Sequence, residues 1–358
     1  MMNVISPGGK IGIIGGGHIA RMMAQAAFAL GYRVHIFCRD AESPAVHVSN
    51  HVTLADFNDT EALEHFAENV DIITFEREEI PNELAIYLSK TKTVIPRWKE
   101  LDIAYNRLKE RGFLHSLELP IAKYCPVNSA VKLEEAYYKL NCSKAIFKAM
   151  KATSEGSGHI ILEGNNPDFQ AIWDKCGIKE GILEPIIPFT KELSVIIARG
   201  FDTKYVTYDV TEYINNGPNF CSSVTPADIS EATRESAYGI ANKIANELHL
   251  VGILTVEFFM KKDGSLLVNE ITPRPNETGY WTQGGCFVNQ FEQFIRAICG
   301  LPLGSSKRHS KVATNMVFGK DDEDFIELLK DKSNRLYLYG LKNISDESVI
   351  GHINKIIT

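Results

Sequence analysis

Short hydrophobic runs separated by amphipathic stretches dominate the first hundred residues. Four of these runs have the uninterrupted apolar character of buried strands: Lys10–Ile14, Arg33–Phe37, Asp71–Phe75 and Thr93–Ile95. Three amphipathic segments between them are typical of helices: His18–Leu30, Thr60–Glu68 and Pro81–Lys90. The alternation predicts a parallel sheet with helices on its faces over residues 10–96, and therefore an α/β fold class.

The pattern changes after residue 100, where strands follow one another more often. We expect helices at 106–117, 132–140 and 230–248. We expect strands at 145–149, 160–162, 181–187, 192–199, 253–260 and 265–271, and an alternating segment at 335–339. A Gly/Ser-rich stretch, 153–158, separates the first two of these strands, as a loop between them would. This region therefore differs in character from the strand–helix alternation of the first hundred residues.

Composition limits the protein classes that fit this pattern. The chain has 358 residues, 44% of them hydrophobic and 23% charged, which suits two or three packed globular units. The net charge of −7 and the lack of a long basic run argue against nucleic-acid partners. No apolar run is long enough to span a membrane, and Met1–Gly9 does not resemble a secretory signal. Seven scattered cysteines without a Cys-x-x-Cys pair favour reduced thiols and a cytoplasmic location.

The first candidate site is the turn Gly15-Gly16-Gly17, which lies between a predicted strand and a helix. With Ala20 it fits the glycine fingerprint of dinucleotide-binding folds, in which phosphate approaches the helix N-terminus. That fold also needs an acidic residue at the end of the second strand, where this chain has Cys38-Arg39. Nicotinamide binding is therefore a minor alternative to a tight turn or another phosphate-binding role.

A predicted hairpin near Asp263-Gly264 is the stronger signal. If Lys262 pairs with Ser265 across a two-residue turn, Glu257 falls directly opposite Glu270 on one face of the sheet. Two opposed carboxylates repel each other, and a divalent cation between them removes that cost. The alternative is two solvated acids on an exposed face, but the apolar neighbours of Glu257 argue against it.

Three further residues extend this site. The amide of Asn269, beside Glu270, can complete a magnesium shell, and Arg274 between two prolines can neutralise a transferring phosphoryl group. Lys148 lies on an apolar strand before the Gly/Ser-rich stretch and can reach nucleotide phosphates, although a lone strand lysine more often extends toward solvent.

The order of motifs resembles the 5-(carboxyamino)imidazole ribonucleotide synthase family of the ATP-grasp superfamily, from Ile11 to about Ile353. The resemblance is carried by Ile14–Gly17 with Arg21-Met22, Ser43–Ala45, Thr74–Glu76 with Ile80-Pro81, Pro188–Ser194, Val268–Arg274, Gln290–Glu292 with Arg296-Ala297, Gly300–Gly304, Leu338–Gly340 and Gly351-His352. It implies an N-terminal parallel-sheet (Rossmann-like) domain at 1–100, an ATP-grasp domain at 101–300 and a small C-terminal domain at 301–358.

The resemblance also implies roles for individual residues. The implied ATP-binding residues are Arg107, Lys148, Thr153, Glu155, Gly156, Gly158, Glu184, Ile187, Glu192, Asn215 and Asn269, and Glu257 and Glu270 match the Mg²⁺ carboxylates. Within that set, the backbone of 184–187 would meet adenine and Glu192 the ribose. Gly17, His18 and Glu76 fall where the family handles its ribonucleotide substrate, and Arg274 is the implied catalytic cation.

The chain departs from the family pattern at several positions. Ser157 replaces the loop lysine, Arg111 an early lysine, His18 a glutamine and Asn215 a histidine. Pro275–Tyr280 reads Pro-Asn-Glu-Thr-Gly-Tyr where Pro-His-Asn-Ser-Gly-His is usual.

Ser348 and Val349 stand where the family has two cations for the substrate phosphate. We expect Lys342 to substitute in part, with Arg21 and the triple-glycine turn as a second anchor. We also expect the 153–159 loop to order over the phosphates.

The resemblance implies that ATP, with Mg²⁺, phosphorylates bicarbonate and that the amine of aminoimidazole ribonucleotide captures the carboxyl group. Two alternatives stay open: a related ATP-grasp ligase with another amine, and a non-catalytic nucleotide-binding relative. We further expect a cytoplasmic homodimer without nucleic-acid or membrane partners.

Overall fold

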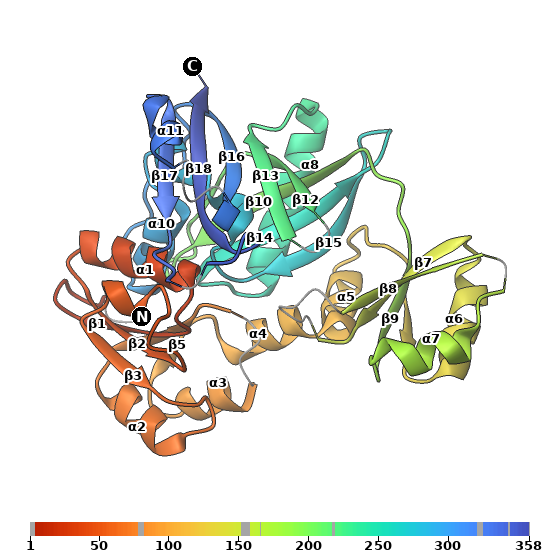
Figure 1. Cartoon of the computed structure of the whole chain (residues 1–358), viewed down its shortest axis with the longest axis horizontal. Helices are drawn as coiled ribbons and strands as arrows, with labels where there is room; N and C mark the ends of the chain where they lie inside the picture. Colours follow the sequence, from red (N-terminus) through yellow and green to blue (C-terminus); the bar gives the residue numbers. More distant parts are fainter. Residues whose placement is uncertain are drawn as a thin grey trace.

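The structure, a computed structural model, describes residues 4–77, 82–151, 158–164, 166–216, 219–320, 325–342 and 344–357. The N-terminal unit is a parallel sheet in the order β3-β2-β1-β4-β5, at the lower left of Figure 1. Its strands are β1 (Lys10–Ile14), β2 (Arg33–Cys38), β3 (His51–Leu54), β4 (Ile72–Phe75) and β5 (Thr93–Val94). Its helices are α1 (His18–Ala29), η1 (Val46–Val48), α2 (Thr60–Glu68) and α3 (Asn82–Leu88). The parallel sheet predicted for residues 10–96 is therefore confirmed.

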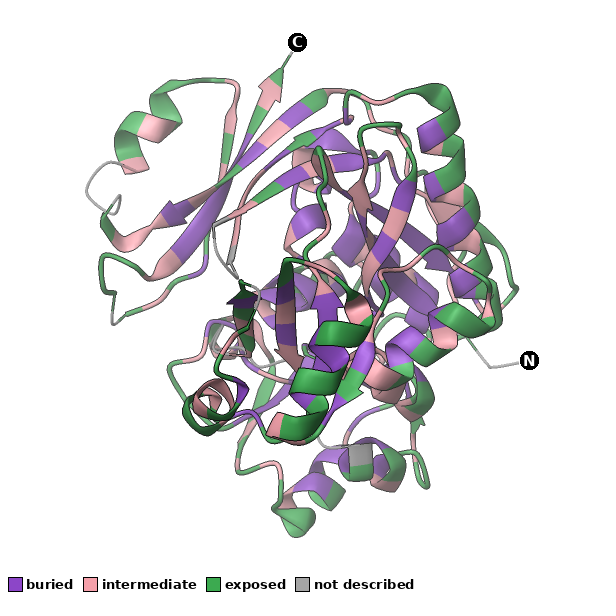
Figure 2. Cartoon of the chain, turned by 90° about the vertical axis from the view of Figure 1, so that its right-hand side faces the viewer, coloured by how far each residue is buried: buried purple, intermediate pink, exposed green. Residues whose placement is uncertain are grey.

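Helix α1 covers one face of this sheet because its apolar residues fall on a single stripe. Ile19, Met23 and Ala27 are buried there, and they pack in one core with Phe291 and Phe294 from the far end of the ATP-grasp region. Figure 2, coloured by burial, shows the same division on other helices of the chain, which have one exposed and one buried side. The N-terminal unit is therefore docked on the rest of the chain through α1.

Two helices lead from the N-terminal sheet to a small antiparallel sheet, at the right of Figure 1. The helices are α4 (Trp98–Tyr105) and α5 (Arg107–Ser116). The sheet has the order β6-β9-β7-β8. Its strands are β6 (Cys125–Val127), β7 (Lys144–Ala149), β8 (His159–Glu163) and β9 (Gly181–Pro185), covered by α6 (Ala130–Leu140) and α7 (Phe169–Cys176). Strand β9 ends at Pro185, two residues earlier than predicted.

The largest sheet runs β15-β14-β10-β12-β13-β16-β18-β17, with β11 also paired to β10. Its strands are β10 (Lys191–Arg199), β11 (Tyr205–Thr207), β12 (Thr211–Asn216), β13 (Asn219–Thr225), β14 (Gly252–Met260), β15 (Leu266–Thr272), β16 (Lys311–Phe318), β17 (Asn334–Leu338) and β18 (Val349–Ile357). The associated helices are α8 (Glu231–Glu247), η2 (Glu277–Gly279), α9 (Thr282–Gly285), α10 (Gln290–Ile298) and α11 (Phe325–Lys330). The C-terminal strands thus continue the sheet that β10, β14 and β15 begin.

The β14–β15 hairpin differs from the predicted two-residue turn. The backbone N–H of Lys261 donates to Ser265 O at 2.9 Å, so the loop has three residues, and Gly264 adopts φ +81°. A regular ladder from that loop would put Glu257 opposite Asn269. A register shift between Glu257 and Phe258 instead leaves Asn269 as the extra residue of a bulge. Glu257 pairs with Glu270 after all, as predicted, because the bulge compensates for the longer loop.

No helix in the described residues is both long enough and apolar enough to cross a membrane.

Candidate active site

Glu257 and Glu270 face each other at the end of the large sheet, in a partly buried, polar environment. The Tyr213 hydroxyl donates to Glu257 Oε2 at 2.7 Å, and Arg107 Nη1 lies 3.6 Å from Glu270 Oε2. Burial and the neighbouring Glu270 charge raise the pKa of Glu257 well above its usual range, while the Tyr213 hydrogen bond partly opposes this. The pair therefore carries an electrostatic cost that a cation would relieve.

The residues around this pair fit a divalent cation that also binds substrate oxygens. Ser194 lies opposite Glu257 on β10, and its buried hydroxyl has no hydrogen-bond partner within the described part of the chain. Carboxylate and amide oxygens are the donors that Mg²⁺ takes, and Mg²⁺ usually keeps water and phosphate as further ligands. No cluster of three or more His, Cys, Asp or Glu side chains that could hold a metal occurs among the described residues.

A buried ion-pair network connects this pair to the small sheet. Lys148 Nζ lies 2.7 Å from Glu184 Oε2, and Arg111 Nε lies 2.6 Å from Glu184 Oε1. Arg111 Nη1 also lies 2.8 Å from Glu110 Oε2, and Glu110 Oε1 accepts the backbone N–H of Ile271 at 2.8 Å. Burial would raise the pKa of Glu184, but the charges of Lys148 and Arg111 lower it to about 2.

This network reaches from the β7–β9 sheet to the residue after Glu270. It includes two residues that the sequence analysis predicted to bind nucleotide, Lys148 and Glu184. Glu110 was not predicted, and Arg111 was noted only as a departure from the family.

The other predicted nucleotide residues lie on three neighbouring elements. Asn215 Nδ2 donates to Glu192 Oε1 at 3.5 Å, so β12 and β10 bring these two together. Burial raises the pKa of Glu192, and this hydrogen bond opposes the shift. Ile187 follows the end of β9, and the Gly158 carbonyl accepts the N–H of Ala149 at 2.7 Å where β7 meets β8. Thr153, Glu155 and Gly156 lie outside the described residues, as does the rest of the 153–157 segment.

The triple-glycine turn makes room for the Glu76 carboxylate. The Glu76 carboxylate accepts the N–H of Gly17 at 2.7 Å and the N–H of Ala20 at 3.3 Å, at the N-terminus of α1. A Cβ on Gly17 would collide with this carboxylate. The Glu76 carboxylate thus takes two of the N–H groups at this helix N-terminus, and the phosphate anchor expected there stays a prediction.

His18, the first residue of α1, contacts the two other units. Its Nε2 lies 3.6 Å from Glu277 Oε1, and its ring stacks on Tyr339 with the ring centroids 4.5 Å apart. Burial would raise the pKa of Glu277, but the neighbouring His18 imidazole and the charge of Arg274 lower it to about 2. Arg274 Nη1 also donates to Pro275 O at 3.1 Å. Six residues of chain, 271–276, thus separate Glu270 from Glu277, which His18 contacts.

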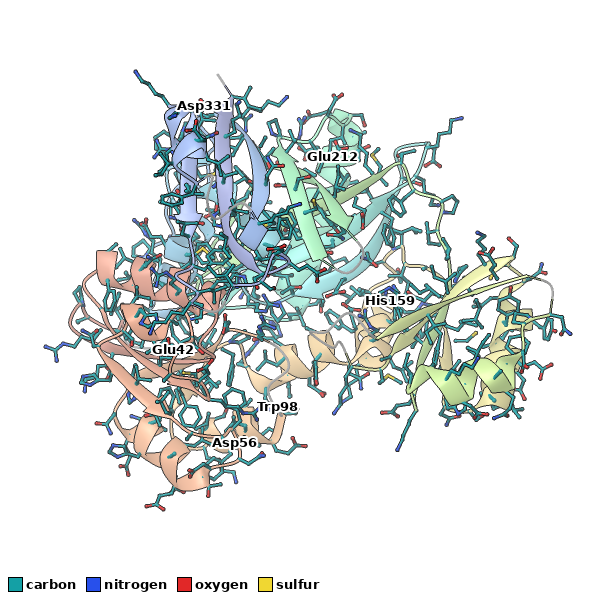
Figure 3. The ribbon with its side chains drawn as sticks, in the orientation of Figure 1. Glu42, Asp56, Trp98, His159, Glu212 and Asp331 are labelled. Atoms are coloured by element: carbon teal, nitrogen blue, oxygen red, sulfur yellow. The ribbon has the colours of Figure 1, made fainter. Side chains whose placement is uncertain are left out.

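Lys342 lies at the surface and pairs with the N-terminal unit. Its Nζ lies 2.6 Å from Glu42 Oε2, and both side chains are about half exposed. Arg21, the other expected phosphate anchor, donates to Pro44 O at 3.0 Å. Both cations therefore face the 42–44 loop, which Figure 3 marks with Glu42.

Comparisons with known proteins agree with this arrangement. The ribonucleotide synthetase preATP-grasp domain matches residues 9–105 and the ATP-grasp domain residues 112–291. The N5-carboxyaminoimidazole ribonucleotide synthase of Brucella melitensis is 36% identical, over 98% of this chain and 97% of the relative. The bifunctional purine synthesis protein purC/E of Dictyostelium discoideum is also 36% identical, but the chain spans only 37% of its length.

A solved N5-carboxyaminoimidazole ribonucleotide synthetase in complex with ADP has the same fold. It superimposes with a TM-score of 0.95 at 33% identity, over 100% of this chain and 94% of that one.

Proposed function

Because the chain belongs to the N5-carboxyaminoimidazole ribonucleotide synthase family of ATP-grasp enzymes, we propose that it is an ATP-dependent carbon–nitrogen ligase of purine biosynthesis. In this proposal it joins the amine of 5-aminoimidazole ribonucleotide to the carboxyl group of bicarbonate. The observation that supports this most directly is the carboxylate pair Glu257–Glu270, joined through Glu110 and Arg111 to Lys148 and Glu184. In this proposal Lys148 is the phosphate-binding cation, the carboxylate pair is the metal site, and the nucleotide binds between them.

The nucleotide residues have distinct roles in this proposal. Glu184 and the backbone of Ile187 face adenine, Glu192 with Asn215 holds the ribose, and Arg107 and Lys148 contact the phosphates. The segment with Thr153, Glu155, Gly156 and Gly158 contributes backbone N–H groups. Glu257, Glu270 and Asn269 would hold Mg²⁺, which when bound neutralises phosphate charge and aligns the transferred group.

The second half of the reaction takes place beside Arg274. In the proposed sequence ATP phosphorylates bicarbonate, and the attacking amine then displaces phosphate from the activated carboxyl group. Arg274 neutralises the negative charge of the transferring groups. Gly17, His18, Glu76 and Lys342 line the substrate side. Catalysis by this chain is then mostly positioning and charge neutralisation.

We also propose the three-domain division at 1–100, 101–300 and 301–358, a cytoplasmic location and a homodimer. The family membership supports the location. Light scattering on the purified protein tests the dimer, and a mass of one chain at micromolar concentration would contradict it.

The function is tested by ADP release with bicarbonate, with and without aminoimidazole ribonucleotide. Stimulation by this amine is the expected result. A ligase for another amine is the second candidate. Ser348 and Val349, where β18 begins, stand in place of the two cations that the family has for the substrate phosphate. ATP hydrolysis that this amine leaves unchanged, but another amine stimulates, would favour the second candidate. ATP binding without turnover on any amine would favour a non-catalytic relative.

A further inference from the structure

A buried carboxylate outside the proposed site, that of Glu100 on α4, forms an ion pair with Arg97. The Glu100 side chain is 2% exposed, and it accepts the backbone N–H of Arg97 at 2.6 Å and Arg97 Nε at 2.9 Å. Burial raises the pKa of Glu100, and the charge of Arg97 opposes this shift. Because a buried carboxylate needs a close cation, Glu100 holds the Arg97 guanidinium in one orientation.

The same guanidinium also contacts the C-terminal end of α8. Arg97 Nη2 donates to Leu248 O at 2.6 Å and to His249 O at 2.9 Å, directly after Glu247, the last residue of the helix. The last carbonyls of a helix lack partners within the helix and carry partial negative charge, so a cation is favourable there. The start of α4 is therefore fixed to a helix end 151 residues away along the chain.

Helix α4 transmits this contact to α5. Asn106 is the C-cap of α4 and the N-cap of α5, so no loop separates the two helices, which follow one another between the N-terminal unit and the small sheet in Figure 1. Leu101 of α4 packs in the core of the N-terminal sheet, whereas Ile103 packs in the core that contains Ile244 of α8. Such apolar packing is not directional, so the charged hydrogen bonds of Arg97 are what set the orientation of α4.

Helix α5 carries two cations of the proposed nucleotide site. Arg107 Nη1 lies 3.6 Å from Glu270 Oε2 on the large sheet, and Arg111 Nε lies 2.6 Å from Glu184 Oε1 on the small sheet. Because one helix contacts both sheets, a small rotation of α5 changes both contacts together. Nucleotide affinity then depends on the orientation of α5.

We propose that Arg97 and Glu100 are positioning residues of the nucleotide site. They fix α4 to the end of α8, and α4 in turn holds α5 at the angle that places Arg107 and Arg111 in the site. The inference rests on the proposed function for the nucleotide as the ligand. It adds two residues that lie outside the nucleotide site and act on it only through α5.

The test is calorimetric binding of ADP, with Mg²⁺ present, to Arg97→Lys and to the double variant Arg97→Gln/Glu100→Gln. Arg97→Lys keeps a positive charge but loses the planar fork that contacts the carboxylate and both carbonyls in one geometry. The double variant removes the contact without leaving a buried charge unpaired. We expect each to raise the dissociation constant of ADP about three- to tenfold. Melting curves verify that each variant folds.

Arg199→Lys is the matched control. Arg199 Nη1 donates to Leu250 O at 2.8 Å, in the same turn after α8, but Arg199 belongs to β10 and not to α4. It should lower the melting temperature and leave the dissociation constant of ADP within twofold of the wild type. An equal rise of this constant in Arg199→Lys would overturn the proposal. So would a constant within twofold of the wild type in both Arg97 variants, because Arg97 and Glu100 would then only stabilise the fold.

The route through α5 is tested by combining Arg97→Lys with Arg111→Lys. If both act on the orientation of α5, the combined rise in the dissociation constant is clearly smaller than the product of the two single rises. A combined rise equal to that product would contradict this route.

The two proposals fail separately, because ADP binding is measured without bicarbonate or an amine. ADP release that aminoimidazole ribonucleotide does not stimulate would contradict only the proposed function. Stimulated ADP release with ADP binding that is insensitive to the Arg97 variants would contradict only the positioning role.

Discussion

At the scale of single residues, the first prediction concerns the negative charge of Glu270. Glu270→Gln removes one of two opposed carboxylates but keeps the shape of the side chain. We expect turnover to fall more than tenfold, because the cation loses a charged ligand, while the fold survives. Steady-state ADP release and a melting curve measure the two effects.

Glu212→Gln is a matched control for this substitution. Glu212 lies on β12 of the same sheet, opposite Leu193 and thus on the other face from Glu192 and Tyr213. It pairs only with Lys191 in the described contacts, 2.6 Å away, and is labelled in Figure 3. Equal loss of activity in both variants would show that any charge removed from this sheet is harmful. A wild-type melting temperature unaffected by Mg²⁺ and ATP would also contradict the metal site.

Glu257 gives the site a pH dependence. Burial and the Glu270 charge raise the pKa of Glu257 to about 8, so most molecules must lose a proton when a cation binds below that pH. We expect Mg²⁺ affinity to rise from pH 6 to pH 8, by up to about tenfold per pH unit, and to level off above. Titration of the metal at several pH values measures this, and Glu257→Gln should flatten the profile.

Without the metal, the same raised pKa makes the stability of the folded protein change with pH in the opposite direction. Between the ordinary carboxyl pKa and pH 8 the folded protein binds more protons than the unfolded one, so this group's contribution to stability falls as pH rises. A Mg²⁺ affinity that does not change over this range would show that Glu257 is already ionised.

The sequence pattern predicted the two acidic residues Glu257 and Glu270 but not the side chains that contact them. Glu257 and Glu270 follow from local alternation and a turn signal, which a sequence displays directly. Tyr213 hydrogen-bonds Glu257 across β10, and the register of β12 against β10 has no local signature. For the same reason the sequence pattern did not predict the hydrogen bond from Gly17 N–H to Glu76, which lies 59 residues away along the chain.

At the scale of elements, the β14–β15 hairpin shows how a correct prediction can rest on a wrong detail. The two-residue turn was wrong, and the three-residue loop alone would have separated the acids. The bulge at Asn269 restores their pairing. Turn chemistry can be read from Asp263-Gly264, but a bulge depends on what the strand must present to its neighbours.

Helix α5 supplies the next prediction, through Arg111. Its guanidinium contacts Glu110 and Glu184 with different nitrogens in a fixed planar geometry, which the compact ammonium of a lysine does not reproduce. We expect Arg111→Lys to raise the KM for ATP several-fold with a smaller change in kcat, because Glu184 and Lys148 are less well positioned. Arg111→Ala should cost about 3–5 kcal/mol of stability, since it leaves buried carboxylates unpaired.

Kinetics and melting curves check both substitutions. Lys109→Gln is the control on the same helix, because Lys109 makes an exposed pair with Asp102 at 2.6 Å. Unchanged ATP kinetics in Arg111→Lys would mean that the network supports the fold and does not position the nucleotide.

At the scale of the whole molecule, strand order was the least predictable feature. The sequence did not show that the strands of the proposed C-terminal domain, β16, β17 and β18, join the sheet that carries Glu192 and Glu257. Local patterns identify strands such as β17 but do not state which sheet they join. The resemblance supplied the overall order of units, and this explains why the fold class was predicted more completely than the contacts between units.

The last prediction concerns the contact between units at His18 and Glu277. The neighbouring His18 imidazole and the charge of Arg274 hold the pKa of Glu277 at about 2 despite its burial. A carboxyl group with a depressed folded pKa stabilises the protein above its ordinary pKa, and that stabilisation is lost as pH falls toward the folded value. Glu277→Gln should therefore lower the melting temperature at pH 6, with a difference that shrinks as the pH approaches 2.

His18→Gln should produce a similar loss, and the double variant should be little worse than either single one, because both substitutions remove the same contact. Additive losses, or a difference between Glu277→Gln and wild type that is constant with pH, would show that Glu277 is stabilised within its own loop. The N-terminal unit would then be held mainly by the packing of α1 against α10. The His18–Glu277 pair would be left to act on the substrate rather than on the docking of the units.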